Sequence, residues 1–340
     1  MQKFTLPLAA LVTLLLAGTS IAAPAVVAST KPVHSLVSAV MGEAGNPTLL
    51  VKGAASPHNY SLRPSDAAAL ESADVVFWTG HGMELFLADA LDTLATNAQV
   101  VELAETDGIT LLPVREGGAF EAHSHGDDDH GHDHAHDDHD HEHDHDDHAH
   151  EHDHGDHAHE EHAHEEHAHD EGDMHFWLDP ENARLMVTQI AAVLSEADPD
   201  NATTYQANAE AELVRLEDLT AELNETLAPV AGKPFVVFHD AYQYFEARFG
   251  LEVAGAVTVS PEAMPGAARI DQLRARVAEL GATCVFAEPN FEPAIVRTIV
   301  EGTDAKAGVL DPEGASLTEG PDLYPELLRG LATSLVDCLG

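Results

Sequence analysis

The sequence is poor in basic residues, in cysteine and in long apolar runs, and each shortage excludes a class of protein. Lysine and arginine together number 15 against 60 aspartates and glutamates, so the formal net charge is -45 at pH 7. A polyanion repels nucleic-acid phosphates, which excludes a general nucleic-acid binder. The same charge suits a protein that handles cations.

Only two cysteines occur, Cys284 and Cys338, and neither belongs to a CxxC pair. A thiolate metal site is therefore not expected. In an oxidising compartment an isolated pair most often forms a disulfide, with two free buried thiols as the alternative. Closing a loop of this length would stabilise the fold by about 4 kcal/mol in the chain-entropy model.

The start of the chain is the one place where an apolar run indicates targeting. Lys3 precedes an apolar stretch over residues 6–17, which is too short to span a bilayer, and small residues follow it. Residues 1–23 are thus predicted to be a secretory signal peptide, with an uncleaved anchor as the alternative. No cysteine stands directly after the run to carry a lipid, and no later segment has the roughly 20 apolar residues of a transmembrane helix. We expect a soluble mature protein that is not embedded in the membrane.

Buried strand patterns alternate with helical patterns in both halves of the chain, which predicts an α/β fold with parallel sheets. Residues 24–196 form the predicted N-terminal lobe, 197–231 a linking helix with leucines at three-to-four-residue spacing, and 232–340 the C-terminal lobe. The predicted strands cover residues 25–29, 48–51, 74–78, 99–103, 235–238, 253–259, 284–287 and 307–310. The predicted helices cover residues 32–41, 64–72, 83–96, 180–196, 199–227, 241–249, 265–280, 293–301 and 321–338.

A histidine-rich acidic stretch interrupts the N-terminal lobe. Residues 123–171 hold 20 of the 25 histidines and 20 of the 60 acidic residues, with no lysine or arginine. Nothing there is more apolar than alanine, so burial cannot offset the entropy of ordering, and a disordered loop is predicted over about 118–172. We interpret the loop as a set of weaker metal-ion sites that gathers or buffers the ion or senses sufficiency; an acidic solubilising insertion is the alternative.

Five histidines remain outside this loop: His34, His58, His81, His175 and His239. His58 lies in a turn-rich segment between a predicted strand and helix. His175 follows the histidine-rich loop directly, and His239 ends a predicted strand, where open α/β sheets bind ligands. The other two are predicted to be surface or cleft-rim residues. Three histidines from both halves of the chain suggest a metal site between the lobes.

The segments around these histidines resemble the periplasmic zinc-binding component of high-affinity zinc ABC importers, the ZnuA type. The matching segments are HNYSLRPSD (58–66), MHFWL (174–178), VFHDAY (237–242) and CVFAEP (284–289). The acidic histidine-rich insertion and the late cysteine pair, a disulfide in close relatives, belong to the same resemblance. It implies a two-lobed solute-binding fold with a long rigid helix between the lobes. It also implies His58, His175 and His239 as zinc ligands, and a periplasmic monomer that serves an inner-membrane permease and its cytoplasmic ATPase.

Neutral imidazole is a good ligand for Zn²⁺, and three imidazoles leave one tetrahedral position open. Some relatives place a glutamate immediately before the first histidine, where this chain has Pro57. The fourth ligand is therefore Glu288, water or a loop histidine. Asp240 and Glu288 could instead orient a ligand imidazole from behind. Arg63 and Asp66 are predicted to brace the turn of the first histidine; a surface pair is the alternative.

Several functions compete with the importer component. Manganese-binding relatives place carboxylates at more ligand positions, and a nitrogen-rich site favours Zn²⁺. Three histidines and water on zinc can also make a nucleophilic hydroxide, but no further motif supplies a substrate pocket or general base, so an enzyme is not expected. A free periplasmic zinc buffer or chaperone without a transporter remains as the alternative.

Overall fold

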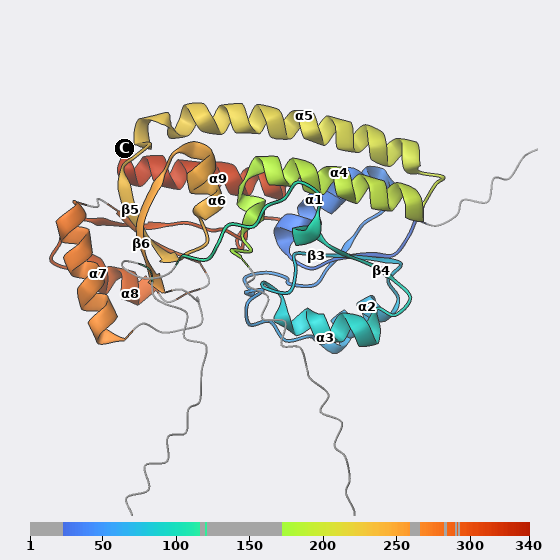
Figure 1. Ribbon diagram of the computed structural model, residues 1–340, viewed down its shortest axis with the longest axis horizontal. Coiled ribbons are helices and arrows are strands. Elements are labelled where there is room, and N and C mark those ends of the chain that lie inside the picture. The colour runs from blue at the N-terminus through green and yellow to red at the C-terminus, as the bar shows by residue number, and fades with distance from the viewer. Residues whose placement is uncertain are drawn as a thin grey trace, which may run out of the picture.

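The computed structural model describes residues 23–115, 120, 172–258, 266–281, 284–289, 291 and 293–340. The predicted signal peptide up to residue 22 and the predicted zinc-gathering loop over 123–171 lie outside the described residues. Two parallel four-stranded sheets form the described part, with strand orders β2-β1-β3-β4 and β6-β5-β7-β8. They lie side by side under one long helix (Figure 1). The α/β fold class with two parallel sheets and a connecting helix is confirmed.

The first sheet belongs to the N-terminal half of the chain, and its strands are short and apolar because helices cover both faces. On one face Val27 and Val76 pack against α2 and α3, while Val26 and Phe77 face α1 and α4 on the other. Its elements are β1 (Val26–Ala28), α1 (Lys31–Met41), β2 (Thr48–Leu49), α2 (Pro64–Glu71), β3 (Val75–Trp78), α3 (Leu85–Leu94) and β4 (Gln99–Glu102).

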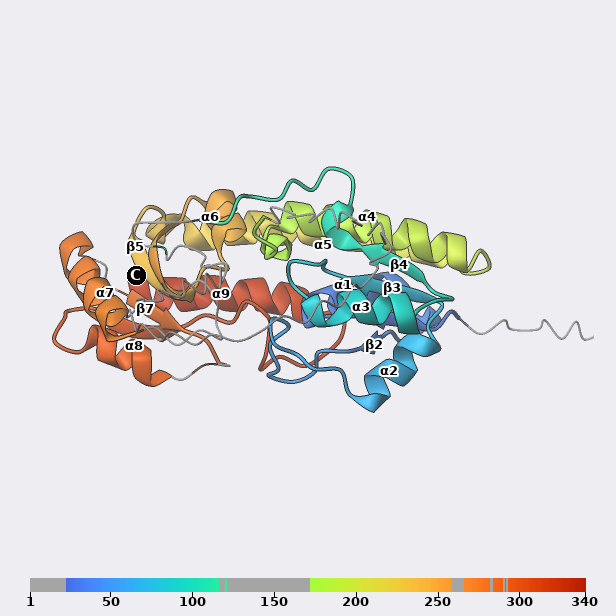
Figure 2. The same cartoon turned by 60° about the horizontal axis from the view of Figure 1, so that its bottom comes forward.

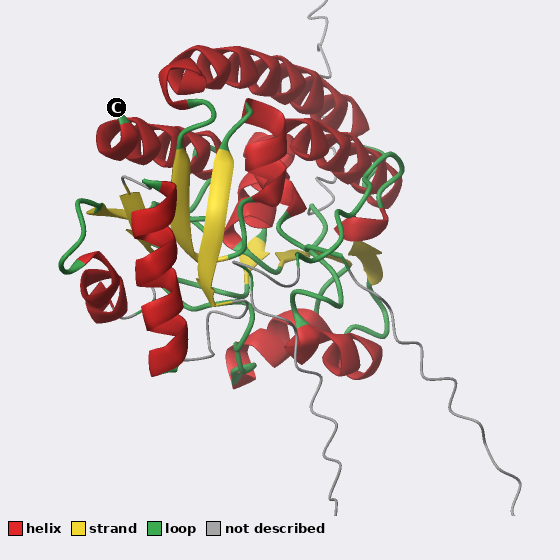
Figure 3. Ribbon diagram, turned by 60° about the vertical axis from the view of Figure 1, so that its left-hand side comes forward, coloured by secondary structure: helices red, strands yellow, loops and turns green. Residues whose placement is uncertain are grey.

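The second sheet repeats this design with β5 in its interior, and Figure 3 shows the long β5 and β6 strands flanked by helices. Alternate residues of β5 face opposite layers. Val236 and Phe238 pack with α7 and α8, whereas Phe235 and Val237 belong to the core shared with α6 and α9. Its elements are β5 (Pro234–His239), α6 (Gln243–Phe249), β6 (Glu252–Thr258), α7 (Ala267–Leu280), β7 (Cys284–Ala287), α8 (Pro293–Val300) and β8 (Lys306–Val309).

Three helices hold the two sheets in one frame: α4 (Pro180–Ala197), α5 (Ala202–Leu227) and α9 (Leu323–Leu339). Figures 1 and 2 show α5 running past both sheets. Asn208 of α5 donates to the Val40 carbonyl of α1 at 2.9 Å, and Glu222 near its other end pairs with Arg329 of α9 at 2.7 Å. Both ends of α5 are thus fastened to different parts of the fold, which makes it a rigid connection.

The end of the chain ties the second sheet back to the first. A disulfide joins Cys284 of β7 to Cys338 of α9, which confirms the predicted pairing. Ahead of α9, the buried Lys31 ammonium of α1 donates to the Gly314 and Ala315 carbonyls, both at 2.9 Å. The two hydrogen bonds of Lys31 cross between the lobes and hold the segment that follows β8 against α1. Among the helices that the structure describes, none is long and apolar enough to span a membrane.

Candidate metal centre

The structure brings three of the predicted site residues together between the lobes. Ring centroids lie 5.4 Å apart for His58 and His175, 5.7 Å for His58 and His239, and 5.1 Å for His175 and His239. One ligand atom from each lies within 4.8 Å of the others. Within the described ranges, this is the one group of three or more histidine, cysteine or acidic residues close enough to hold a metal ion.

His58 is presented by a braced turn between β2 and α2. The buried Asp66 accepts hydrogen bonds from the Tyr60 hydroxyl at 2.8 Å and the Arg63 backbone N–H at 2.9 Å. The Tyr60 hydroxyl oxygen also lies 3.2 Å from the Leu50 carbonyl oxygen, which places the turn against the end of β2. Asp66 therefore braces the turn as predicted, through backbone and tyrosine rather than through a surface ion pair.

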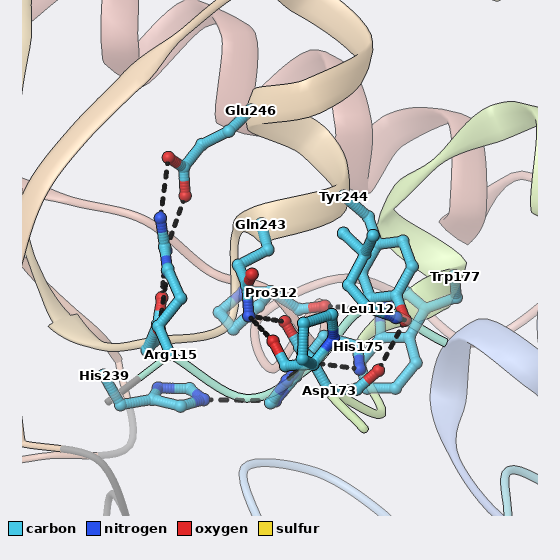
Figure 4. Close-up of polar contacts among 12 residues, drawn as sticks. Leu112, Arg115, Asp173, His175, Trp177, His239, Gln243, Tyr244, Glu246 and Pro312 are labelled. Carbon is cyan, nitrogen blue, oxygen red and sulfur yellow. Dashed lines mark hydrogen bonds and ion pairs between the residues drawn. The ribbon is translucent and has the colours of Figure 1, made fainter. Parts of the chain in front are cut away.

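The two other histidines are oriented by carboxylates. His175 Nδ1 lies 2.7 Å from Asp173 Oδ1, and His239 Nδ1 lies 2.6 Å from Glu288 Oε1. These contacts leave the two Nε2 atoms free to face each other, at a separation of 3.2 Å. Figure 4 shows the contact between the two rings. A carboxylate on the far ring nitrogen fixes the tautomer of a ligating histidine and increases its basicity.

His58 contributes the third ligand atom of the group. Its Nε2 is buried, and no described residue makes a hydrogen bond to it. A buried polar atom without a partner is unusual and needs a physical explanation. This nitrogen lies beside His175 and His239, whose Nε2 atoms face each other, so a bound metal ion would supply the missing partner.

The histidines differ in their affinity for protons. Burial, and then the charges of the two neighbouring histidines, hold the pKa of His58 well below its ordinary value of 6.5. Burial would also lower the pKa of His239, but the Glu288 carboxylate, together with the charges of Asp240 and Asp173, raises it above 6.5. His58 is thus neutral and ready to bind a cation, whereas a proton competes for His239 first.

The remaining predicted residues take other places. Glu288 is buried and engages His239 Nδ1, and it is not part of the group of close ligand atoms. This geometry favours its alternative role as the carboxylate that orients the imidazole. Asp240 does not act this way in the described contacts: its carboxylate pairs with the Arg115 guanidinium. His34 lies outside the group, with Nε2 3.2 Å from the Pro47 carbonyl, but it is buried on α1 and not at the surface or cleft rim as predicted.

Sequence reasoning missed two residues near the site. Asp173 stands two positions before His175, so the D-x-H spacing could have indicated it. Arg115 had no such signal, because it precedes its partner Asp240 by 125 residues. The exposed His81, which contacts Glu102 at 3.3 Å, belongs to the loop after β3, in keeping with its predicted place outside the ligand set.

The comparisons with known proteins identify the family of the chain. A family profile described as "Zinc-uptake complex component A periplasmic" matches residues 26–338. The chain belongs to the ZnuA family. This family comprises solute-binding components of zinc uptake, not enzymes, so the expectation of a non-enzymatic binding protein is confirmed.

Relatives support this membership, and solved structures share the fold. The chain is 58% identical over 314 residues to the high-affinity zinc uptake system protein ZnuA of Brucella abortus, covering 92% of this chain and 91% of the relative. It is 44% identical to ZnuA of Paracoccus denitrificans over 318 residues, covering 93% and 92%. A crystal structure of ZnuA superposes with a TM-score of 0.70 at 24% identity, covering 94% of this chain and 100% of the other.

The shared fold does not by itself choose the metal. A manganese-bound periplasmic metal-binding protein from Candidatus Liberibacter asiaticus superposes with a TM-score of 0.69 at 18% identity, over 93% of this chain and 100% of that protein. The donor atoms must therefore carry the distinction, and the three inward groups of this site are imidazoles.

Proposed function

We propose that the protein captures Zn²⁺ with His58, His175 and His239 and delivers it to the permease of an ABC importer. The observation that carries the proposal is the meeting of three imidazoles, of which one has a buried unpartnered nitrogen and two are oriented by carboxylates. Neutral nitrogen donors favour Zn²⁺ over Mn²⁺, which supports zinc over the manganese-type alternative. Three protein ligands leave a position open for a fourth donor.

We assign that fourth position to water. A histidine of the loop and direct coordination by Glu288 are the alternatives, but the hydrogen bond to His239 supports an orienting role for Glu288. An open or water-filled position also suits a carrier, because the permease can offer a replacement ligand before the protein ligands release the ion. Zinc-edge X-ray absorption would give the total number of nitrogen and oxygen donors and, from the outer-shell scattering of the rings, the number of imidazoles: three imidazoles in a total of four support water or Glu288, and four imidazoles support a loop histidine.

We infer that residues 1–23 direct export and are removed, so that the mature chain works in the periplasm. Residues 24–196 and 232–340 then act as the two lobes, with 197–231 as the linking helix. N-terminal sequencing of the protein recovered from a periplasmic extract tests this. A start at Met1 would contradict it.

The predicted loop over 123–171 is assigned additional, weaker zinc sites that gather or buffer the ion near the centre. Its polar composition predicts that binding at each of these sites has an ordering entropy cost that the preformed centre does not have. Deleting these residues should lower the zinc stoichiometry sharply and leave one tight site. Loss of the tight site would contradict this division of roles.

A knockout separates the importer component from a free periplasmic buffer. In a strain without other zinc uptake, a null mutant should fail to grow under zinc chelation and should recover with added zinc. Normal growth of that mutant would favour the buffer. Complementation with the His175→Ala variant should fail if delivery depends on the three-histidine centre.

A further inference from the structure

Arg115 makes a four-point contact next to the metal centre. Its Nε donates to Asp240 Oδ2 at 2.8 Å, and its Nη2 contacts Asp240 Oδ1. Its Nη1 and Nη2 also donate to Glu246 at 3.1 Å and 2.8 Å. The carboxylates are largely buried, with side-chain exposures of 6% for Asp240 and 11% for Glu246. Bidentate contacts of this kind give geometric precision as well as energy.

The segment that carries Arg115 also contacts Asp173, the residue that orients the proposed ligand His175. The Leu112 carbonyl accepts the Asp173 N–H at 2.7 Å, and Leu112 N–H donates to the Tyr244 hydroxyl at 2.8 Å. The same hydroxyl donates to the Asp173 carbonyl at 2.7 Å. Asp173 in turn orients His175. Figure 4 shows this set of contacts from Arg115 to His175.

Residues 112–115 therefore form a strap: Leu112 at one end contacts the segment that carries His175, and Arg115 at the other end contacts the segment that carries His239. One end holds Asp173, which orients His175, and the other holds Asp240, which directly follows His239. The two histidines come from different lobes, and their Nε2 atoms must stay about as close as the observed 3.2 Å to share an ion. A strap that spans both ligand segments reduces the freedom that binding would otherwise have to remove.

We propose that Arg115 is a positioning residue that preorganises the metal centre by holding the His239 segment against the His175 segment. The inference rests on the proposed zinc site. Without the guanidinium, Asp240 and Glu246 become two buried carboxylates near each other with no cation between them. Their repulsion and need for water would displace the backbone next to His239. Arg115 itself does not touch the ion.

The test uses the full-length chain with Arg115→Gln and, as a matched control, Arg329→Gln. Arg329 also forms a bidentate pair, with Glu222, but between α9 and α5 and away from the histidines. Zinc affinity is measured by chelator competition below one equivalent of zinc, so that the tightest site is read. One equivalent of Co²⁺ reports the ligand geometry through its visible absorption, and thermal unfolding of the metal-free protein reports the fold.

We expect Arg115→Gln to weaken zinc binding by about 10–100-fold, the range for residues that support metal ligands, and to change the Co²⁺ spectrum. Arg329→Gln should stay within about twofold of the parent. Lysine keeps the positive charge but lacks the planar guanidinium that contacts both carboxylates, so Arg115→Lys should bind zinc with intermediate affinity. Adding Asp240→Asn to Arg115→Gln should recover part of the lost affinity, because it removes one of the two carboxylate charges that the missing guanidinium leaves unpaired.

Parental affinity and an unchanged spectrum in Arg115→Gln would overturn the inference. An equal loss of affinity in the Arg329→Gln control would do so as well, since the effect would then reflect general destabilisation. If Arg115→Gln does not fold, Arg115→Lys decides, and parental binding by that variant counts against the strap. His175→Ala tests the centre itself: tight binding by that variant would refute the proposed zinc site, whichever result Arg115 gives.

Discussion

Replacing Glu288 by glutamine should weaken zinc binding at pH 7.5 and should also make the zinc affinity less dependent on pH. Glu288 Oε1 lies 2.6 Å from His239 Nδ1, and both side chains are buried, with exposures of 4%. Glutamine keeps the size of the side chain and removes its charge. The ring loses the carboxylate that makes it a stronger base, so zinc affinity at pH 7.5 should fall by about 10–100-fold, or roughly 1.4–2.7 kcal/mol.

The pH profile follows from the pKa of His239. In the parent this pKa lies above 6.5, so below it zinc must displace a proton and the apparent Kd rises up to about tenfold per pH unit. Burial lowers the pKa of His58 well below 6.5, so protons compete less for that ring than for His239. Glu288→Gln removes the main influence that raises the pKa of His239 and leaves the lowering effect of burial. The loss of affinity on acidification should therefore begin at lower pH in the variant.

Chelator-competition titrations at pH 7.5, 6.5 and 5.5 compare the parent, Glu288→Gln and the control Glu222→Gln, whose carboxylate pairs with Arg329 away from the site. The expected result is weaker binding at pH 7.5 together with a flatter pH profile. Unchanged affinity would refute the orienting role. A loss above about 1,000-fold, beyond the range for supporting residues, would indicate that Glu288 binds the ion directly.

Three further predictions concern the frame around the site. Replacing Cys284 and Cys338 together by serine should lower the free energy of unfolding by about 4 kcal/mol in urea denaturation, and a change below about 1 kcal/mol would contradict the chain-entropy account. Asp173→Ala should weaken zinc binding at least as much as Glu288→Gln, because Asp173 holds both the ring and the backbone N–H of His175. Gly80→Ala should destabilise the fold by about 1–3 kcal/mol in thermal unfolding, since the φ of Gly80 is +149° and a Cβ there would lie 2.5 Å from Glu102 Oε1. The control Gly330→Ala should not destabilise the fold, because a Cβ at Gly330 would meet open space.

The sequence predicted the strands well because the buried parallel strands are apolar on both faces. The predicted strand 284–287 coincides with β7, and 74–78 differs from β3 by one residue. The start of the long helix differs from its predicted position. The linking helix was expected to begin at Pro199, but α5 begins at Ala202, because Asp198 to Asn201 form a turn in which Asp198 accepts a hydrogen bond from the Asn201 side chain at 2.8 Å.

The site was predictable where local spacing carries the information. His58, His175 and His239 stand beside recognisable turns and strand ends, and the fold brings these together. The supporting contacts were harder to foresee. Arg115 reaches Asp240 across 125 residues, and Tyr244 reaches Asp173 across 71, so only the packing of α6 against the strap reveals them.

The central claim is that three distant imidazoles bind one zinc ion, and titration of single variants tests it most directly. With residues 123–171 deleted, His58→Ala, His175→Ala and His239→Ala are each titrated with zinc beside the parent and His81→Ala. The account predicts one tight equivalent in the parent and in His81→Ala, and a loss beyond about 100-fold in each of the other three, more than loss of a supporting residue causes. Parental affinity in any one of those three variants would contradict it.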